Sequence, residues 1–195
     1  MRRIQIGWWR MPFVLAFLFL CSMAWPQALQ ASEEAWRALQ EGGTIALFRH
    51  ARAPGTGDPT NFRLEDCATQ RNLSAEGRRQ AQAIGEAFRT RRIPVERVLS
   101  SRWCRALDTA RLAFGALTEP FPPLDSFFEG REQEPARTQA VRRTIQEWRS
   151  NGVLVLVTHQ VNITALTGIF PAEGEMLVLR PKQDAGFDLV GRIKL

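Results

Sequence analysis

A chain of 195 residues is long enough for one domain with a buried core, and 45% hydrophobic with 24% charged residues is a globular composition that argues against disorder. The formal net charge of +6 includes Arg2, Arg3 and Arg10, and without them 23 basic residues face 20 acidic ones. A net charge near +3 with no basic stripe interleaved with aromatic residues argues against a nucleic-acid-binding protein.

The N-terminus has the order of a secretory signal peptide over residues 1–31. A positively charged start is followed by an apolar run at residues 11–24, which is too short for a comfortable membrane span, and then by small residues up to Ala31. We therefore expect cleavage between about residues 24 and 31 and a periplasmic or secreted protein. The alternative is an uncleaved N-terminal anchor, and that leader is the only membrane contact expected.

Strand-like and helix-like patterns alternate along the rest of the chain, separated by turn residues. In chain order these patterns predict a strand at 44–48, a long loop at 53–72, a helix from the cap Ser74 to about 89, a strand at 95–99, a helix from the cap Ser101 to about 114, an irregular crossing at 120–123, a helix from Pro135, a strand at 153–157, a helix from about 161, and a hairpin of 176–179 and 187–193.

This alternation predicts an α/β fold with a single three-layer αβα domain over residues 32–195 and a mostly parallel central sheet. Ligands of such sheets bind beyond the carboxyl ends of the strands. Long loops in compact domains usually serve function, so the loop at 53–72 is expected near the site.

The only two histidines of the chain lie at the carboxyl ends of two predicted strands. His50 follows the first strand beside Arg49, and His159 follows the strand at 153–157. The strand at 95–99 ends in a polar segment that includes Arg105. Imidazole can accept a phosphoryl group and arginine forks can hold its oxygens, so the set indicates phosphoryl transfer. The sequence has no metal-ligand spacing, and we expect neither a metal nor a cofactor.

Four sequence blocks in order resemble the histidine phosphatase superfamily, the relatives of the cofactor-dependent phosphoglycerate mutases. The blocks are Arg49-His50-Ala51, Leu73-Ser74-Ala75-Glu76-Gly77-Arg78-Arg79-Gln80-Ala81, the segment 100–110 with Arg105, and Thr158-His159. The resemblance implies the phosphoglycerate mutase-like fold. It also implies that His50 is the nucleophile, that Arg49, Arg105 and His159 hold the phosphoryl oxygens, and that His159 is an imidazolium at the moment of transfer.

The function implied by the resemblance is a metal-independent phosphatase acting on a small phosphorylated molecule, such as a sugar phosphate, or on a phosphoprotein. The segment between residues 113 and 153 is short and leaves little for the lid of a mutase, which makes a mutase the second choice. A non-catalytic phospho-ligand-binding protein on the same fold is the alternative from another class, because a fold alone does not prove catalysis.

The sequence departs from the family pattern at two positions. Ala51 replaces a glycine, which is a small change, whereas the family's glutamate acid falls on Ser126. We predict Glu129 as the general acid instead, at the rim of the cleft, with Asp125 second; Glu132 and Glu134 lie nearby. A substrate with a good leaving group, such as phosphohistidine, would need no acid.

Other residues near strand ends are weaker candidates. Arg52 is predicted to bind substrate, and each of the others is as well explained by a solvated or packed side chain; they are Arg63, Arg102, Trp103, Gln160 and Asn162. Removing the leader removes Cys21 and leaves Cys67 and Cys104, an even pair for an oxidising compartment. Bonded, the pair would tether the long loop to the helix that carries Arg105.

Overall fold

The computed structural model describes residues 25–182 and 186–195, with the side chains of the first helix from Ser32 on. Its centre is a six-stranded sheet in the order β3-β2-β4-β1-β5-β6. The strands are β1 (Ile45–Arg49), β2 (Val95–Ser100), β3 (Thr118–Pro120), β4 (Val153–Thr158), β5 (Met176–Pro181) and β6 (Phe187–Ile193). The pairs β1–β4, β2–β4 and β2–β3 are parallel, and β5 runs antiparallel to both β1 and β6.

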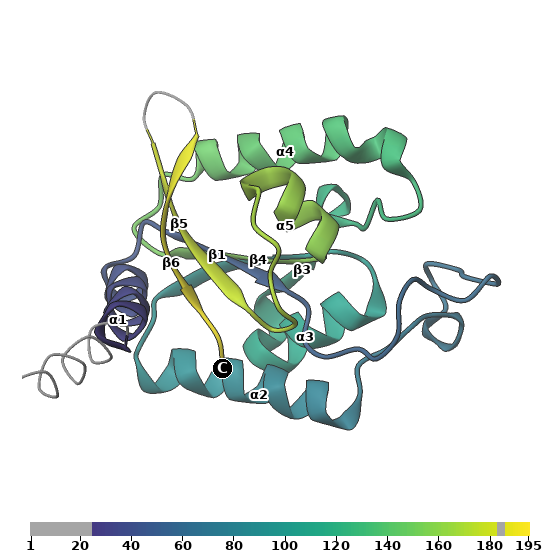
Figure 1. The fold of residues 1–195 in the computed structure, drawn as a ribbon, viewed down its shortest axis with the longest axis horizontal. Helices are drawn as coiled ribbons and strands as arrows, with labels where there is room; N and C mark the ends of the chain where they lie inside the picture. Colours follow the sequence, from purple (N-terminus) through teal and green to yellow (C-terminus); the bar gives the residue numbers. More distant parts are fainter. Residues whose placement is uncertain (1–24, 183–185) are drawn as a thin grey trace, which may run out of the picture.

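Helices cover both faces of this sheet, so the predicted three-layer α/β fold is confirmed (Figure 1). The helices are α1 (Trp25–Glu41), α2 (Ala75–Thr90), α3 (Cys104–Phe114), α4 (Glu134–Glu147) and α5 (Gln160–Thr167). Short 3-10 turns lie at η1 (Cys67–Thr69), η2 (Gly115–Leu117), η3 (Pro122–Leu124) and η4 (Arg131–Gln133). Among the described helices, none combines the length and apolar character needed to cross a membrane.

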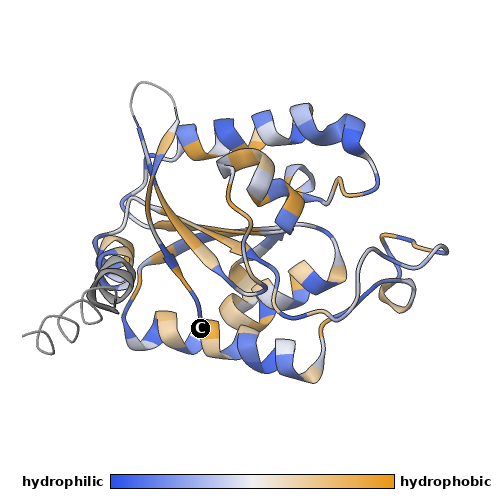
Figure 2. Cartoon of the chain, in the orientation of Figure 1, coloured by the Kyte–Doolittle hydropathy of each residue, from blue (hydrophilic) through white to orange (hydrophobic). Residues whose placement is uncertain are grey.

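Alternation along the central strands supplies both cores. In β4, Val153, Val155 and Val157 pack with α1, α2 and α3, whereas Leu154 and Leu156 pack with α4 and α5. All five side chains are at most 1% exposed, as expected for a strand buried on both faces. Figure 2 shows the hydrophobic strands enclosed between helices whose outer faces are hydrophilic.

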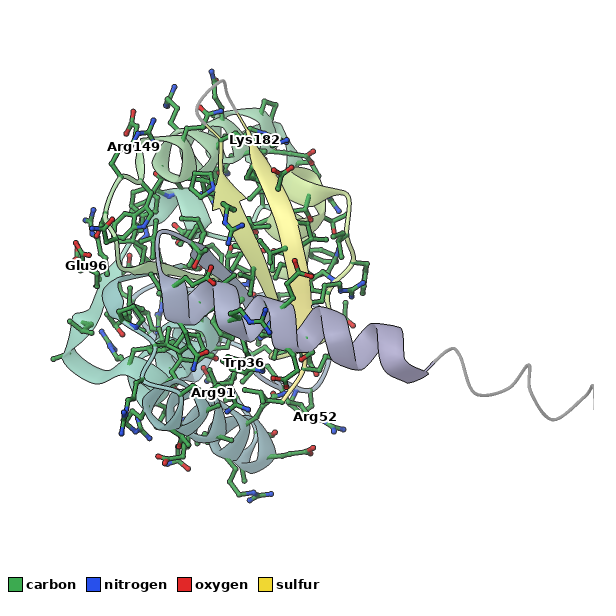
Figure 3. All side chains as sticks on the ribbon, turned by 90° about the vertical axis from the view of Figure 1, so that its left-hand side faces the viewer. Trp36, Arg52, Arg91, Glu96, Arg149 and Lys182 are labelled. Atoms are coloured by element: carbon green, nitrogen blue, oxygen red, sulfur yellow. A yellow bond between two sulfur atoms is a disulfide. The ribbon has the colours of Figure 1, made fainter. Side chains whose placement is uncertain are left out.

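Helix α1 was missed by the sequence analysis, which predicted no element before residue 44. Its residues Ala35, Trp36 and Leu39 are buried in the core beneath the sheet. The Trp36 ring meets Phe88 of α2 edge-on at 5.8 Å, and the Arg91 guanidinium lies 4.3 Å from its centroid (Figure 3). The helix therefore contributes to the core from Ala35 on. Residues 1–24, which hold most of the predicted leader, lie outside the described part.

Strand β3 was also missed. The sequence analysis placed an irregular crossing at 120–123, but Thr118–Pro120 pairs in parallel with β2 at the edge of the sheet. Pro120 is tolerated there because an edge strand does not need every backbone donor.

Candidate active site

The carboxyl ends of β1, β2 and β4 meet at one edge of the sheet and open onto a cleft of about 520 Å³. His50 follows β1, His159 follows β4, and Arg105 lies in the first turn of α3 after β2. All three side chains line the cleft, together with Arg49. The structure thus brings together the four residues that the sequence analysis placed at the site.

The imidazole of His50 is held by its own neighbour. Its Nδ1 lies 2.8 Å from the backbone oxygen of Ala51, which can only accept a hydrogen bond, so Nδ1 carries the proton and Nε2 keeps its lone pair. The His50 amide donates to Thr158 O at 2.9 Å, and the side chain is 2% exposed. No described residue makes a hydrogen bond to Nε2, so this nitrogen remains available for a ligand.

The packing of the segment after His50 explains the alanine found where the family pattern has glycine. Ala51 is fully buried, packs with Ala53, Leu73 and Ala81, and its amide donates to Thr109 Oγ1 at 3.0 Å. The methyl group of Ala51 therefore contributes to packing instead of obstructing the turn.

His159 stands opposite His50, with ring centroids 5.4 Å apart. Its Nε2 lies 2.7 Å from Ser101 Oγ, and its ring meets the Trp103 ring in a T-shaped arrangement with centroids 5.6 Å apart. Ser101 was predicted as the cap of α3, which is wrong: α3 begins at Cys104 with Trp103 as an N-cap that makes no side-chain hydrogen bond. The Ser101 hydroxyl instead orients His159.

Three guanidinium groups surround the two histidines. Arg105 is 3% exposed and pairs with Asp58, with Nη1 2.8 Å from Oδ1. Arg49 donates through Nη1 to Pro171 O at 3.0 Å. Arg71, from the long loop, donates through Nε to Gly57 O at 2.8 Å. A site with this much positive charge and little exposure favours a multiply charged anion such as a phosphoryl group.

Burial and these arginines lower the pKa of both histidines well below 6.5. For His50 and for His159, desolvation has the largest effect and the charge of Arg105 follows. Both imidazoles are therefore neutral at pH 7, which suits His50 as a nucleophile. A phosphoryl dianion bound between them would raise the pKa of His159 and favour the imidazolium that the family resemblance implies.

Comparison with known proteins supports the family resemblance. Residues 45–131 match the sequence model of the histidine phosphatase superfamily, branch 1. This match, together with the fold, supports membership of the histidine phosphatase superfamily. The matched range holds Arg49, His50 and Arg105, whereas His159 lies beyond it and is placed by the fold. No curated protein sequence matches the chain.

Solved structures share the fold of this chain at low sequence identity. The protein histidine phosphatase SixA complexed with tungstate has a TM-score of 0.57 and 14% identity over 77% of this chain and 96% of its own. Mycobacterial glucosyl-3-phosphoglycerate phosphatase, solved with VO3, has a TM-score of 0.54 and 19% identity over 75% of this chain and 96% of its own. At these identities the likeness establishes the phosphoglycerate mutase-like fold.

The two candidates for the general acid differ in position. Glu129 is exposed, lines the cleft and has no hydrogen-bond or ion-pair partner among the described residues. Asp125 does not line the cleft: it is fully buried, and its Oδ2 lies 2.6 Å from Arg102 Nη2. The choice of Asp125 as second acid is therefore corrected, because its carboxylate is buried away from the cleft and accepts hydrogen bonds from Ser101 and Arg102.

Several weaker candidates also lie away from the cleft. Arg52, which was predicted to bind substrate, lies away from the cleft in this structure: its guanidinium is exposed, pairs with Glu76 at 3.0 Å and does not line the cleft (Figure 3). Arg63 pairs with Asp66, and Asn162 donates to Asp125 O. Two of the weaker candidates, Gln160 and Trp103, do line the cleft.

Sequence reasoning missed three charged residues that line the cleft: Asp58, Arg71 and Arg137. Asp58 and Arg71 lie in the long loop that was expected to serve function, but no spacing in the sequence singled them out. Among the described residues, no group of three or more His, Cys, Asp or Glu side chains is placed to hold a metal ion.

The two buried histidines predict how stability depends on pH. In the unfolded chain each titrates near 6.5, whereas in the folded protein each pKa is well below that. Below about pH 6.5 the unfolded state binds more protons, so the free energy of unfolding should fall as the pH drops toward the folded pKa values. The slope should approach ~1.4 kcal/mol per pH unit for each histidine.

Urea unfolding between about pH 7.5 and 5.5 measures this slope. His159→Asn removes one of the two titrating groups and should reduce the slope by about half. A free energy of unfolding that stays constant from about pH 6.5 to 5.5 would contradict two buried, neutral imidazoles.

Cys67 and Cys104 are bonded in the structure, with Cα atoms 5.7 Å apart and a sequence separation of 37. The bond joins η1 of the long loop to the first residue of α3, next to Arg105. A closed loop of this length is worth roughly 3–4 kcal/mol in the chain-entropy model. We predict that reduction, or Cys67→Ser with Cys104→Ser, lowers the free energy of unfolding by about that amount and weakens phosphate binding.

Thiol titration of the unfolded mature protein tests the premise. The expected result after expression in an oxidising compartment is no free thiol, with two appearing on reduction. Two free thiols without reductant would refute the bond.

Proposed function

We propose that this protein hydrolyses a phosphate monoester or phosphoramidate through a phosphohistidine formed on His50. The observation that carries the proposal is the arrangement of His50: its Nδ1 is fixed by Ala51 O at 2.8 Å, and its Nε2 is left for a ligand in a cleft lined by four arginines. A neutral imidazole with a fixed proton is the form that attacks phosphorus.

The residues of the site suffice for both steps. Arg49, Arg105 and His159 hold the equatorial oxygens while His50 Nε2 forms a bond to phosphorus and the bond to the leaving oxygen or nitrogen breaks. Water then attacks phosphorus and gives a proton to the carboxylate that protonated the leaving group, the N–P bond breaks, and phosphate leaves with His50 again neutral. The arginines remain charged throughout, so the site loses no positive charge as negative charge shifts to the leaving group.

Glu129 is the proposed donor of the proton that an alkoxide leaving group needs. A proton donor must be able to reach the leaving group in the cleft. Glu129, the first choice among the predicted acids, lines the cleft, and no described residue pairs with its carboxylate. The glutamate that serves as the acid in the family pattern is absent here, because Ser126 occupies its position; Ser126 also lines the cleft.

Leaving-group dependence tests Glu129. Glu129→Gln should slow hydrolysis of alkyl phosphates by about 10²-fold or more and spare p-nitrophenyl phosphate, whose leaving group hardly needs a proton. Glu132→Gln is the matched control, because Glu132 also lines the cleft. Equal rates of Glu129→Gln and the parent protein on alkyl phosphates would reject Glu129 and favour a substrate with a good leaving group, such as phosphohistidine.

The proposed substrate is a small phosphorylated molecule, such as a sugar phosphate, or a phosphoprotein. Among proteins of this fold, SixA is named a protein histidine phosphatase, and the mycobacterial enzyme is named for a phosphorylated glycerate derivative. We also propose that the protein is exported, on the strength of the charged, apolar and small-residue order of residues 1–31.

Turnover separates this proposal from a phospho-ligand-binding protein on the same fold. Purified mature protein should hydrolyse p-nitrophenyl phosphate over many turnovers, with the same rate in EDTA. Phosphate binding without turnover would favour the binding protein, and activity lost in EDTA and restored by a divalent metal would move the protein to another reaction class.

A further inference from the structure

Arg105 has five N–H groups, and the structure accounts for three of them. Nη1 donates to Asp58 Oδ1 at 2.8 Å and to Arg71 O at 3.3 Å, and Nη2 donates to Asp58 Oδ2 at 3.1 Å. The Nε–H is buried without a partner, and no further hydrogen bond joins Nη2 to a described residue. Nε and Nη2 lie on the same edge of the guanidinium, so two parallel N–H groups remain.

Two free parallel donors on a side chain that is only 4% exposed need an explanation, because buried polar groups are ordinarily paired. A guanidinium edge of this kind binds two oxygens of one phosphate. Arg49 shares part of this arrangement: a backbone oxygen, Pro171 O, accepts from its Nη1, and its Nε is buried without a partner, but its Nη2 lies 3.7 Å from Glu173 Oε1. Arg105 therefore keeps both donors of its Nε edge free, whereas Arg49 keeps its Nε alone without a partner.

Both carboxylate oxygens of Asp58 accept two hydrogen bonds each. Its Oδ1 accepts from the Arg71 amide at 3.0 Å as well as from Arg105, and its Oδ2 accepts from Trp103 Nε1 at 3.0 Å as well as from Arg105. Burial by itself raises the pKa of Asp58, but the hydrogen bonds from Arg105 and Arg71 outweigh it and lower the pKa overall. A carboxylate with four donors is a fixed anchor and not a loosely placed counter-ion.

We propose that Asp58 is a positioning residue that, from the long loop, holds the terminal fork of Arg105 so that its Nε edge receives the phosphoryl group. The inference rests on the proposed function, because it assigns the task of Asp58 within that same site. The disulfide between Cys67 and Cys104 supports the arrangement by joining the loop of Asp58 to the residue next to Arg105.

Charge and orientation make opposite predictions for Asp58. Removing a carboxylate beside an anion site should strengthen phosphate binding if only its charge matters, or if the carboxylate competes with phosphate for Arg105. If Asp58 acts by orienting Arg105, its removal should weaken phosphate binding despite the favourable change in charge. Loss of an outer partner that orients a ligand-binding group typically costs roughly 10–100-fold in affinity.

Direct binding of inorganic phosphate, measured by calorimetry, gives the sign of the effect. Asp58→Ala is expected to weaken binding by at least roughly tenfold. Asp108→Ala is the matched control and should bind like the parent. Asp108 lies on α3, the helix that carries Arg105, but it pairs with Arg78 at 3.0 Å and does not line the cleft. Unchanged or tighter binding by Asp58→Ala would overturn the inference and leave the proposed function standing. A parent protein that does not bind phosphate would instead overturn the proposed site.

A double-mutant cycle distinguishes orientation of Arg105 from a general effect on the loop. If Asp58 acts through Arg105, Asp58→Ala should change phosphate affinity little in an Arg105→Ala background. An undiminished effect of Asp58→Ala in that background would show that it acts on the fold of the loop, and would also overturn the inference.

Discussion

His50→Ala is expected to lower the rate of phosphate ester hydrolysis by ~10⁴-fold or more, because it removes the Nε2 that we propose as the nucleophile. The variant should still bind phosphate or vanadate, since Arg49, Arg105 and His159 remain in the cleft. Steady-state rates with p-nitrophenyl phosphate and calorimetry with vanadate measure the two properties separately.

The loss must be shown not to arise from unfolding, because His50 is 2% exposed. Retained vanadate binding provides that control. Undiminished turnover in His50→Ala would contradict covalent catalysis at this residue, whatever the state of the fold.

Arg105→Lys is expected to lower kcat/KM by about 10²–10³-fold, although it keeps the positive charge. Lysine presents a single ammonium, so it cannot both pair with Asp58 and offer two parallel N–H groups to a phosphoryl group. Removing one preorganised donor to a transition-state oxygen typically has an effect of this size. Kinetics with aryl and alkyl phosphates should show the same loss, because Arg105 is proposed to contact the phosphoryl group, which both substrates share, and not the leaving group.

Arg78→Lys is the matched control for Arg105→Lys. Arg78 also pairs with an aspartate, Asp108, but its side chain is half exposed and does not line the cleft. We expect its kcat/KM to equal that of the parent. A parent-like kcat/KM in Arg105→Lys would show that charge alone suffices at this position.

The sheet and the two histidines could be predicted because they depend on local pattern. A run such as residues 153–157 is apolar at every position, so it identifies a strand buried on both faces, and the residue that follows it must lie at the ligand-binding edge. Arg49, His50 and His159 were placed at the site by this rule together with the family resemblance.

The rest of the site depends on contacts between distant segments. Asp58 and Arg105 are 47 residues apart in sequence, and only the folded loop brings them within 2.8 Å. Asp125 was chosen for its place beside Ser126, yet the chain turns its carboxylate away from the cleft toward Arg102. Helix α1 was not predicted because its first residues overlap the segment 1–31 that was interpreted as a leader, so that its helical pattern was not separated from the apolar run before it.

Trapping the phosphoenzyme tests the central claim most directly. The mature protein, mixed briefly with a phosphate ester and quenched in alkali, should carry one phosphoryl group on His50 that is stable in base and lost in acid. Peptide mass spectrometry locates the group, and His159→Asn, which keeps the nucleophile, should still acquire it at a lower rate. Steady turnover by a protein that never carries phosphate on His50 would contradict the account.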